Sequence, residues 1–313
     1  MDIITLVISV VILILVILSV IVLIKYRTTL SYHIDRLKLI SSQVYQSQQG
    51  SIEYFLQGEG PTILISHGVT GGVDQGIGMS EAFLGAGYRI LSVSRFGYLN
   101  SSLPDSPSPE LQADVYAELL DFLGIDRVFV FGNSAGGTSA IHFAIRHSQQ
   151  CQGLILLSSN APLDTPSGHP PRFIFQSNFL YWLGMTLIGK RMLSMFVTQA
   201  ILDTLPQSEL DQMVQSIYFS ALPVTKRSKG IEFDLSTSNP SINNDVPFDK
   251  ITSPTLIINA IDDPATRIVG ARMLSRNIPH SSLVTFETGG HILLGQEDNI
   301  KQEIRNFINS NTS

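Results

Sequence analysis

Short apolar runs and amphipathic stretches alternate along most of the chain. Residues 127–131 are rich in β-branched and aromatic side chains, and residues 153–158 form another apolar run, as is typical of buried parallel strands. Residues 108–123 begin with the helix-start signal Ser-Pro-Glu and then repeat leucine and valine at helical spacing. Strands are predicted at residues 42–47, 52–56, 62–66, 88–94, 127–131, 153–158, 255–259 and 283–287. The alternation predicts an α/β protein with a mostly parallel central sheet flanked by helices.

The alternation breaks after the sixth predicted strand. Residues 173–205 are dense in large apolar side chains and carry few charges, whereas residues 223–247 are polar and suggest a loop. We therefore predict a helical lid at residues 162–250, inserted between two parts of one core at residues 41–161 and 251–313.

The first residues form a separate hydrophobic unit. Residues 3–24 contain no charged side chain and would span about 33 Å as a helix, against about 30 Å of bilayer hydrocarbon. The run is too long for a cleaved signal peptide, and no small-residue cleavage site follows it. Residues 1–24 are thus predicted to be a transmembrane anchor. Residues 25–40 are predicted to be a short helical connector, and its basic residues place the catalytic domain on the cytoplasmic side.

The strongest chemical motif lies at residues 132–136, which read G-N-S-A-G between a predicted strand and a predicted helix. This is the pattern of a nucleophile elbow, in which a serine occupies a strained turn and flanking glycines allow strand and helix to approach closely. Ser134 is therefore a candidate nucleophile. The backbone N–H of Ala135, at the start of the new helix, would face a developing oxyanion.

Three more landmarks follow predicted strands. Residues 67–72, H-G-V-T-G-G, form a glycine-rich loop in which the Val69 amide is the second candidate oxyanion donor, and His67 is expected to orient the loop. The tandem Asp262-Asp263 precedes a proline, and His291 follows two glycines after the last predicted strand. A serine, then an acid, then a histidine is the order of a catalytic triad on this type of sheet.

These four motifs, taken in this order, resemble the α/β-hydrolase superfamily, in its branch of capped serine hydrolases. The resemblance implies a triad of Ser134, His291 and the aspartate immediately before proline, Asp263. Asp262 and, more distantly, Asp164 remain alternatives for the acid. It also implies an acyl-enzyme mechanism without a cofactor or a metal.

The amino-acid composition limits the classes of molecule that the protein is expected to bind. The chain has 20 Lys and Arg against 26 Asp and Glu, a net charge of −6, with no basic stripe that would fit a nucleic acid. Its single cysteine excludes a cysteine-based metal site. Arg95, after a strand end, and Trp182, in the lid, are candidate substrate-binding residues, although an arginine in such a place more often joins loops through an ion pair.

The leading hypothesis from sequence is a membrane-anchored hydrolase of carboxylic esters, with lipid esters among the candidates because an apolar lid is held near the bilayer. The same triad also serves carbon–carbon bond hydrolysis, perhydrolysis and acyl transfer, and these reactions are kept as alternatives. A catalytically silent binding protein on this fold is the alternative from another class.

Overall fold

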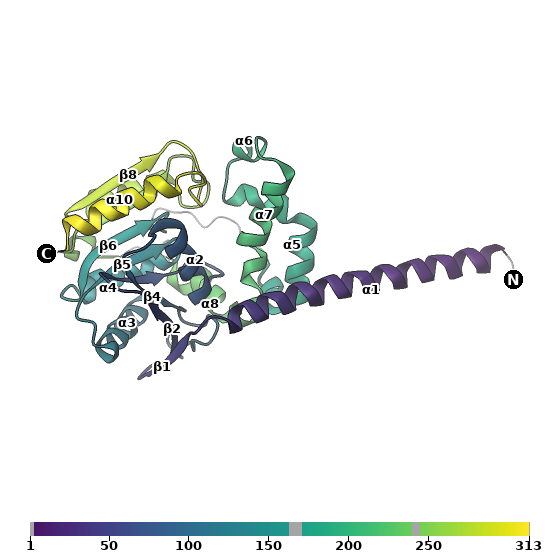
Figure 1. Cartoon of the computed structure of the whole chain (residues 1–313), viewed down its shortest axis with the longest axis horizontal. Helices are drawn as coiled ribbons and strands as arrows, with labels where there is room; N and C mark the ends of the chain where they lie inside the picture. Colours follow the sequence, from purple (N-terminus) through teal and green to yellow (C-terminus); the bar gives the residue numbers. More distant parts are fainter. Residues whose placement is uncertain (1–2, 163–170, 240–244, 313) are drawn as a thin grey trace.

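The computed structural model describes residues 3–162, 171–239 and 245–312 (Figure 1). Its sheet has eight strands in the order β1-β2-β4-β3-β5-β6-β7-β8. Their bounds are β1 Gln43–Ser47, β2 Gly50–Gln57, β3 Thr62–Ser66, β4 Arg89–Val93, β5 Val128–Asn133, β6 Cys151–Leu157, β7 Thr255–Ala260 and β8 Ser281–Phe286. Strand β2 pairs antiparallel with β1 and β4, and every other pairing is parallel. The predicted fold class is confirmed.

Five helices flank the sheet: α2 Val73–Phe83, α3 Pro109–Leu123, α4 Gly136–Arg146, α9 Ile268–Asn277 and α10 Glu297–Ser310. Successive side chains of a strand point to opposite faces, so a strand covered on both sides must be apolar throughout. In β3, Ile63 and Ile65 pack in one core cluster with residues of α10, while Leu64 packs in the other with residues of α3 and α4. The continuous apolar runs seen in the sequence follow from this double covering.

The segment between β6 and β7 is helical in its described residues. It contains η1 Arg172–Gln176, α5 Asn178–Met192, η2 Leu193–Met195, α6 Gln199–Leu202, α7 Gln207–Ile217, η3 Phe219–Ala221, η4 Val224–Lys226, α8 Ser228–Phe233, η5 Asp234–Ser238 and η6 Phe248–Lys250. We call residues 171–239 the lid. The prediction of a polar loop at residues 223–247 is wrong up to residue 238, because residues 224–226 and 228–238 are helical. These helices are held by buried Ile231 and Phe233 and by tertiary ion pairs, which local composition does not reveal.

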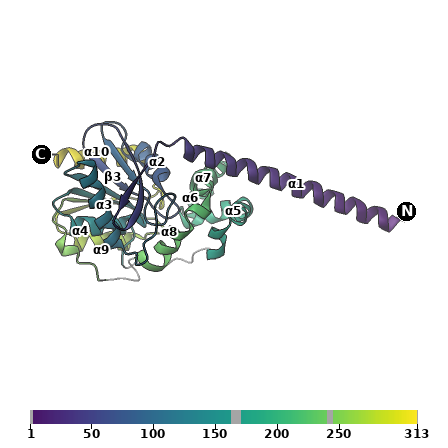
Figure 2. The ribbon, with the colours of Figure 1, turned by 90° about the horizontal axis from the view of Figure 1, so that it is seen from below.

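The N-terminal residues form one helix, α1 Ile3–Lys38, that projects from the rest of the molecule (Figures 1 and 2). The apolar residues and the predicted connector are therefore parts of a single helix. Within the described residues, α1 is the one helix long and apolar enough to cross a membrane, and its large apolar side chains along residues 3–24 are exposed except for Val22, which packs against the lid.

An ionic cluster joins α1, α2 and the lid. The guanidinium groups of Arg36 and Arg227 both donate to Asp74 Oδ2, at 2.6 Å and 2.9 Å, and Arg227 also donates to the Gly71 carbonyl. Burial by itself raises the pKa of Asp74, but the two guanidinium groups outweigh it and lower the pKa to about 2. The carboxylate is thus ionised at neutral pH and fixes the lid against the glycine-rich loop.

Candidate active site

Ser134 occupies the turn between β5 and α4. Its φ of 49° lies in the left-handed region, which is strained for a side chain other than glycine. The neighbouring backbone explains the glycines: a Cβ on Gly136 would lie 2.1 Å from the Ser66 carbonyl oxygen, and one on Gly132 would lie 2.7 Å from the Gly137 Cα. The turn therefore has the geometry that the sequence motif predicts.

Three predicted residues meet at the carboxyl ends of the parallel strands. His291 Nε2 lies 3.1 Å from Ser134 Oγ, and His291 Nδ1 lies 3.0 Å from Asp263 Oδ2. The imidazole is therefore placed to accept the serine proton at one nitrogen while it donates to a carboxylate at the other. This is the arrangement of a Ser-His-Asp triad, and we propose these catalytic roles for the three residues.

The carboxylates of the adjacent Asp262 and Asp263 accept hydrogen bonds from different groups. Asp263 is 4% exposed, and its carboxylate accepts hydrogen bonds from the Ala265 and Thr266 amides as well as from the Thr266 hydroxyl. Asp262 instead accepts the backbone N–H of Gly290 at 2.8 Å, which shapes the loop before the histidine. Asp164, the third candidate, lies outside the described residues.

The carboxylate of Asp263 is held in its charged form. Burial raises its pKa, but the adjacent His291 and the hydrogen bonds from Thr266 outweigh burial, so the pKa falls below its ordinary value. An ionised acid at this position fixes the tautomer of the imidazole and stabilises the imidazolium that forms when Ser134 loses its proton.

The two predicted oxyanion donors lie in different loops beside the nucleophile. Val69 follows β3 and Ala135 follows Ser134, and both residues line the same cavity as the serine. Within the described residues, no protein acceptor is found for either N–H among the loop and turn hydrogen bonds. Both amides are therefore free of a described protein acceptor, and we propose them as the donors to a tetrahedral oxyanion.

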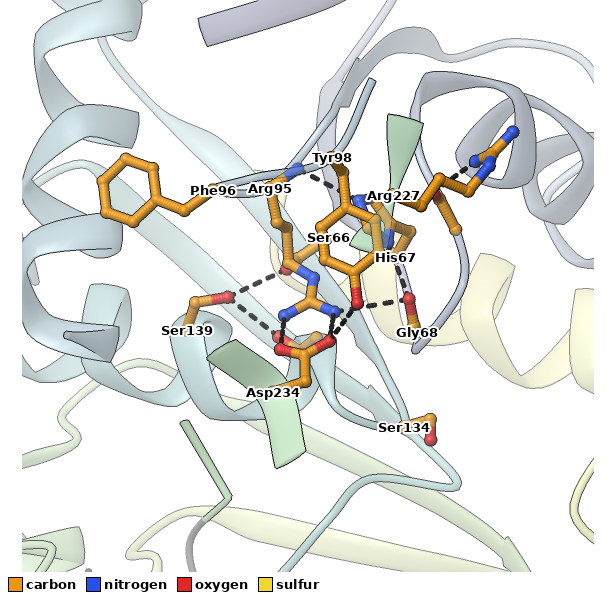
Figure 3. A network of polar contacts seen from close by, with 12 residues as sticks. Ser66, His67, Gly68, Arg95, Phe96, Tyr98, Ser134, Ser139, Arg227 and Asp234 are labelled. Atoms are coloured by element: carbon orange, nitrogen blue, oxygen red, sulfur yellow. Dashed lines mark hydrogen bonds and ion pairs between the residues drawn. The ribbon is translucent and has the colours of Figure 1, made fainter. Parts of the chain in front are cut away.

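The peptide that carries the Val69 amide is fixed through the Gly68 carbonyl (Figure 3). That oxygen accepts from His67 Nδ1 at 2.7 Å and from Arg95 Nη2 at 3.3 Å, while His67 Nε2 accepts from the Arg95 backbone N–H at 3.0 Å. Burial, followed by the nearby Arg95 charge, lowers the pKa of His67 well below its ordinary value. A trans peptide directs its N–H away from its carbonyl, so anchoring the carbonyl points the Val69 N–H to the other side.

Arg95 joins this loop to the lid. Its two terminal nitrogens donate to the two oxygens of Asp234 at 2.6 Å and 2.5 Å, and the Tyr98 hydroxyl donates to the same carboxylate at 2.5 Å (Figure 3). Both side chains of the ion pair are 1% exposed. Burial lowers the pKa of Arg95, but the Asp234 carboxylate outweighs it and the net direction is upward, so the guanidinium stays charged.

The triad opens into a cavity of about 410 Å³ between the sheet edge and the lid. Methionines and other large apolar residues dominate its lining, with Asn133, Asn160 and Gln75 among the polar groups. No lysine or arginine belongs to the lining in the described part of the chain. Besides Val69, Ala135 and Ala265, the apolar residues of the lining are Met79, Phe83, Leu157, Ile174, Phe175, Met185, Met192, Met195, Phe196, Ile217, Ile231, Leu235 and Ile292.

Two sequence predictions of substrate contact need correction. Arg95 is buried behind the glycine-rich loop, and its charge is already paired with Asp234. Trp182 is buried in the lid against Tyr26 and Phe179, with ring centroids 5.6 Å and 6.2 Å away. Neither side chain is among the described residues that line the cavity.

Sequence reasoning missed Thr266 and Asp234. The Thr266 hydroxyl lies 2.7 Å from Asp263 Oδ2 and 3.2 Å from His291 Nδ1, so it supports the contact between acid and base. Its position three residues after Asp263 was a usable local signal, since a hydroxyl or amide at that spacing commonly bonds a turn aspartate. Asp234 offered none, because its partner lies 139 residues away in the chain. Among the described residues, no cluster of three histidine, cysteine or acidic side chains suits a metal ion.

Fold and site together define a hydrolase of the α/β-hydrolase type. A sequence profile for the alpha/beta hydrolase fold matches residues 61–298, which is more than half of the chain. The protein belongs to this family.

Known relatives share most of the chain. A 2-hydroxy-6-oxononadienedioate/2-hydroxy-6-oxononatrienedioate hydrolase of Cupriavidus pinatubonensis is 32% identical over 67% of this chain and 72% of its own length. A second hydrolase of this name, from Pseudomonas putida, is 28% identical over 82% of this chain and 92% of its own length. A solved membrane phospholipase A matches 97% of this chain and 99% of its own with a TM-score of 0.68, but at 18% identity this likeness shows the fold alone.

The relatives correct the leading functional hypothesis. The substrate in their names carries a hydroxyl, a ketone and two carboxylates, and it contains no ester. The prediction of a carboxylic ester hydrolase is therefore wrong, and the findings favour the alternative of carbon–carbon bond hydrolysis. The sequence could not separate these reactions, because both use the same triad and the same oxyanion donors.

The two aspartates can be distinguished by isosteric substitution. Asp263→Asn should lower kcat by about 10⁴-fold, because an amide cannot hold the imidazole in its reactive tautomer. Asp262→Asn should lower kcat by less than about tenfold, since the amide oxygen can still accept the Gly290 N–H and one hydrogen bond contributes about 1 kcal/mol. Steady-state kinetics of both purified variants gives the comparison, and equal losses would contradict the assignment of Asp263.

Arg95 is expected to act as a positioning residue. Arg95→Lys keeps the charge beside Asp234, but an ammonium cannot bond both carboxylate oxygens and the Gly68 carbonyl in one plane. We expect kcat to fall by about 10²-fold with a smaller change in KM, because the displaced Val69 amide serves mainly the transition state.

The matched control for this test is Arg146→Lys. Arg146 makes the same two-pronged contact with Asp114, at 2.8 Å and 2.7 Å, on the surface of the core. The Arg146→Lys substitution should leave kcat unchanged. If Arg95→Lys lowered thermal stability but kept kcat, the Arg95 network would be structural only.

Proposed function

We propose that this protein is a membrane-anchored hydrolase that cleaves a carbon–carbon bond beside a ketone in a 2-hydroxy-6-oxo-dienoic acid. The observation that carries the proposal is the meeting of Ser134, His291 and Asp263 beside two available amides, in a chain 32% identical to a hydrolase named for such a substrate. The named compounds have a hydroxyl at carbon 2 and a ketone at carbon 6. With double bonds at carbons 2 and 4, the hydroxyl would be an enol that is conjugated with the ketone.

The chemistry of such a substrate suits this site. When the hydroxyl proton at carbon 2 moves to carbon 5, carbon 2 becomes a ketone and the remaining double bond lies between carbons 3 and 4. This double bond connects carbon 5 to the new ketone, whose oxygen can receive the electron pair of carbon 5. Breaking the bond between carbons 5 and 6 then releases a stabilised carbanion instead of an alkoxide. The carbonyl at carbon 6 is the electrophile that a serine nucleophile and an oxyanion hole serve.

The first half of the reaction uses the distances in the site. Ser134 Oγ gives its proton to His291 Nε2, 3.1 Å away, and forms a bond to carbon 6. The carbonyl oxygen becomes an oxyanion between the Val69 and Ala135 amides. When it collapses, the electron pair of the bond between carbons 5 and 6 passes to the leaving fragment, which takes up the proton that His291 holds. An acyl group remains on Ser134.

The second half returns the enzyme to its starting state. His291 removes a proton from water, the hydroxide adds to the acyl carbon, and the same two amides bind the new oxyanion. Collapse breaks the bond to Ser134 Oγ, which recovers its proton from His291. One water is consumed, and a carboxylic acid and a dienoic acid are released.

We also propose that α1 anchors the enzyme in a membrane with the catalytic domain on the cytoplasmic side. Support comes from the exposed apolar side chains of residues 3–24 and from the basic residues that follow them. The solved structure titled a membrane phospholipase A resembles 97% of this chain, so the likeness covers most of α1.

The function is tested with two substrates in detergent-solubilised full-length protein. One is 2-hydroxy-6-oxonona-2,4-dienedioate, and in the other a phenyl ring on carbon 6 replaces carbons 7 to 9 together with the distal carboxylate. We expect loss of the dienol absorbance with both. The phenyl substrate should have a kcat/KM at least about tenfold higher, because the described lining offers no lysine or arginine to either carboxylate, an unpaired carboxylate is costly to bury, and the phenyl substrate carries one carboxylate fewer.

Ser134→Ala is the control, and it should lower turnover by as much as about 10⁶-fold without changing the fold. Wild-type protein that leaves both compounds intact, or turnover that survives in this variant, would refute the proposed reaction.

A further inference from the structure

Helix α5 of the lid is apolar on two sides. Tyr181 and Met185 face inward, where they are buried and line the cavity. On the outer side, Leu187 is 72% exposed and Leu180, seven residues earlier and so on the same stripe of the helix, is 43% exposed, while Ile188, 51% exposed, lies at the edge between the two sides. A surface helix of a soluble domain normally presents polar residues outward, and a helix that is apolar all round is normally buried. The outer face of α5 therefore lacks a partner within the described chain.

Helix α1 fixes where that outer face lies. The Tyr26 ring of α1 contacts the rings of Phe179 and Trp182 in α5, with centroids 5.2 Å and 5.6 Å apart. Val22 and Leu30 of α1 pack against the same cluster in the lid. The contact thus falls where the uncharged stretch of α1 ends and its first basic residue, Lys25, appears.

The direction of α5 relative to α1 is also defined in the structure. Figure 1 shows α5 running across the line of α1, on the side of the lid that faces the N-terminus, and Figure 2 shows the same placement from a second direction. A bilayer crossed by residues 3–24 would have its surface at the level of Val22 and Tyr26. Helix α5 would then lie along that surface.

We propose that the outer face of α5 docks on the lipid bilayer, with Leu180 and Leu187 inserted at the boundary between headgroups and acyl chains and Ile188 at the edge of the contact. Two features of the surroundings fit this partner. The partly exposed rings of Tyr26 and Phe179 favour this depth, and Arg191 at the end of α5 suits anionic headgroups, whereas Lys190 is paired with Asp211 at 2.7 Å. The proposal rests on the anchor part of the proposed function and is independent of the reaction.

Docking would place the cavity beside the membrane. The residues of α5 that line the cavity lie on the opposite side of the same helix, so about one helix diameter, roughly 10 Å, separates the cavity from the lipid. Apolar substrates concentrated in the bilayer would then reach the lid without crossing bulk water.

The test uses single fluorescent probes on the full-length chain in nanodiscs that contain one copy each. Cys151 is buried and is replaced first (Cys151→Ser), so that a nitrobenzoxadiazole label attaches only to a new cysteine. Leu187→Cys and Ile188→Cys report on α5. Val269→Cys, 55% exposed on α9, is the matched control, and Leu13→Cys reports on the anchor itself. The bilayer is phosphatidylcholine with phosphatidylglycerol, doped with lipids that carry a nitroxide at a shallow or a deep acyl position.

The proposal expects several-fold stronger quenching at positions 187 and 188 than at 269, with the shallow nitroxide more effective than the deep one. Position 13 should be quenched most by the deep nitroxide. Quenching at 13 but not at 187 or 188 would overturn docking and keep the anchor, while no quenching at 13 would overturn both. If the probes at positions 187 and 188 became protected from water only in discs that hold two copies of the protein, the outer face of α5 would contact a second chain and the bilayer would be rejected as its partner.

Discussion

The approach of two loops within van der Waals distance is the constraint on which the site depends. The glycine-rich loop after β3 and the elbow after β5 are so close that a Cβ on Gly68 would lie 3.3 Å from Ser134 Cβ. Because β3 and β5 are adjacent parallel strands, both loops leave the same edge of the sheet. The contact brings an amide from each loop to one reacting carbon, but it requires glycine at several positions and a strained φ at Ser134.

Buried charge holds this arrangement against the lid. Arg95 with Asp234 and Arg227 with Asp74 each connect a lid residue to the region of the glycine-rich loop. Such pairs add little net stability, since desolvation offsets most of their attraction, yet removing one partner leaves an unpaired buried charge that costs about 3–5 kcal/mol. Their effect is on geometry: they hold the lid over the cavity in one register, and the two arginines also bond the Gly68 and Gly71 carbonyls.

Features encoded locally could be predicted from the sequence. Strand positions follow from apolar runs buried on both sides, and the candidates Ser134 and His291 follow from short motifs in a fixed order, whereas the choice of Asp263 over Asp262 comes from the resemblance to the family. Features that depend on contacts between residues distant in the chain could not be predicted from the sequence. The Arg95 ion pair, the helices within 223–238 and the burial of Trp182 against α1 depend on tertiary contacts. Reaction type was also beyond the sequence motifs, because the triad activates a carbonyl whether oxygen or carbon leaves.

The central claim is that Ser134 takes up the acyl half of a ketone substrate while a carbon–carbon bond breaks. The most direct measurement is mass spectrometry of the peptide that carries Ser134, after turnover of the phenyl ketone is stopped with acid. The account predicts a benzoyl adduct on Ser134 that forms together with the dienoic acid and decays as benzoate appears. Release of both products with no Ser134 adduct at any time, even under conditions that slow water attack, would contradict it.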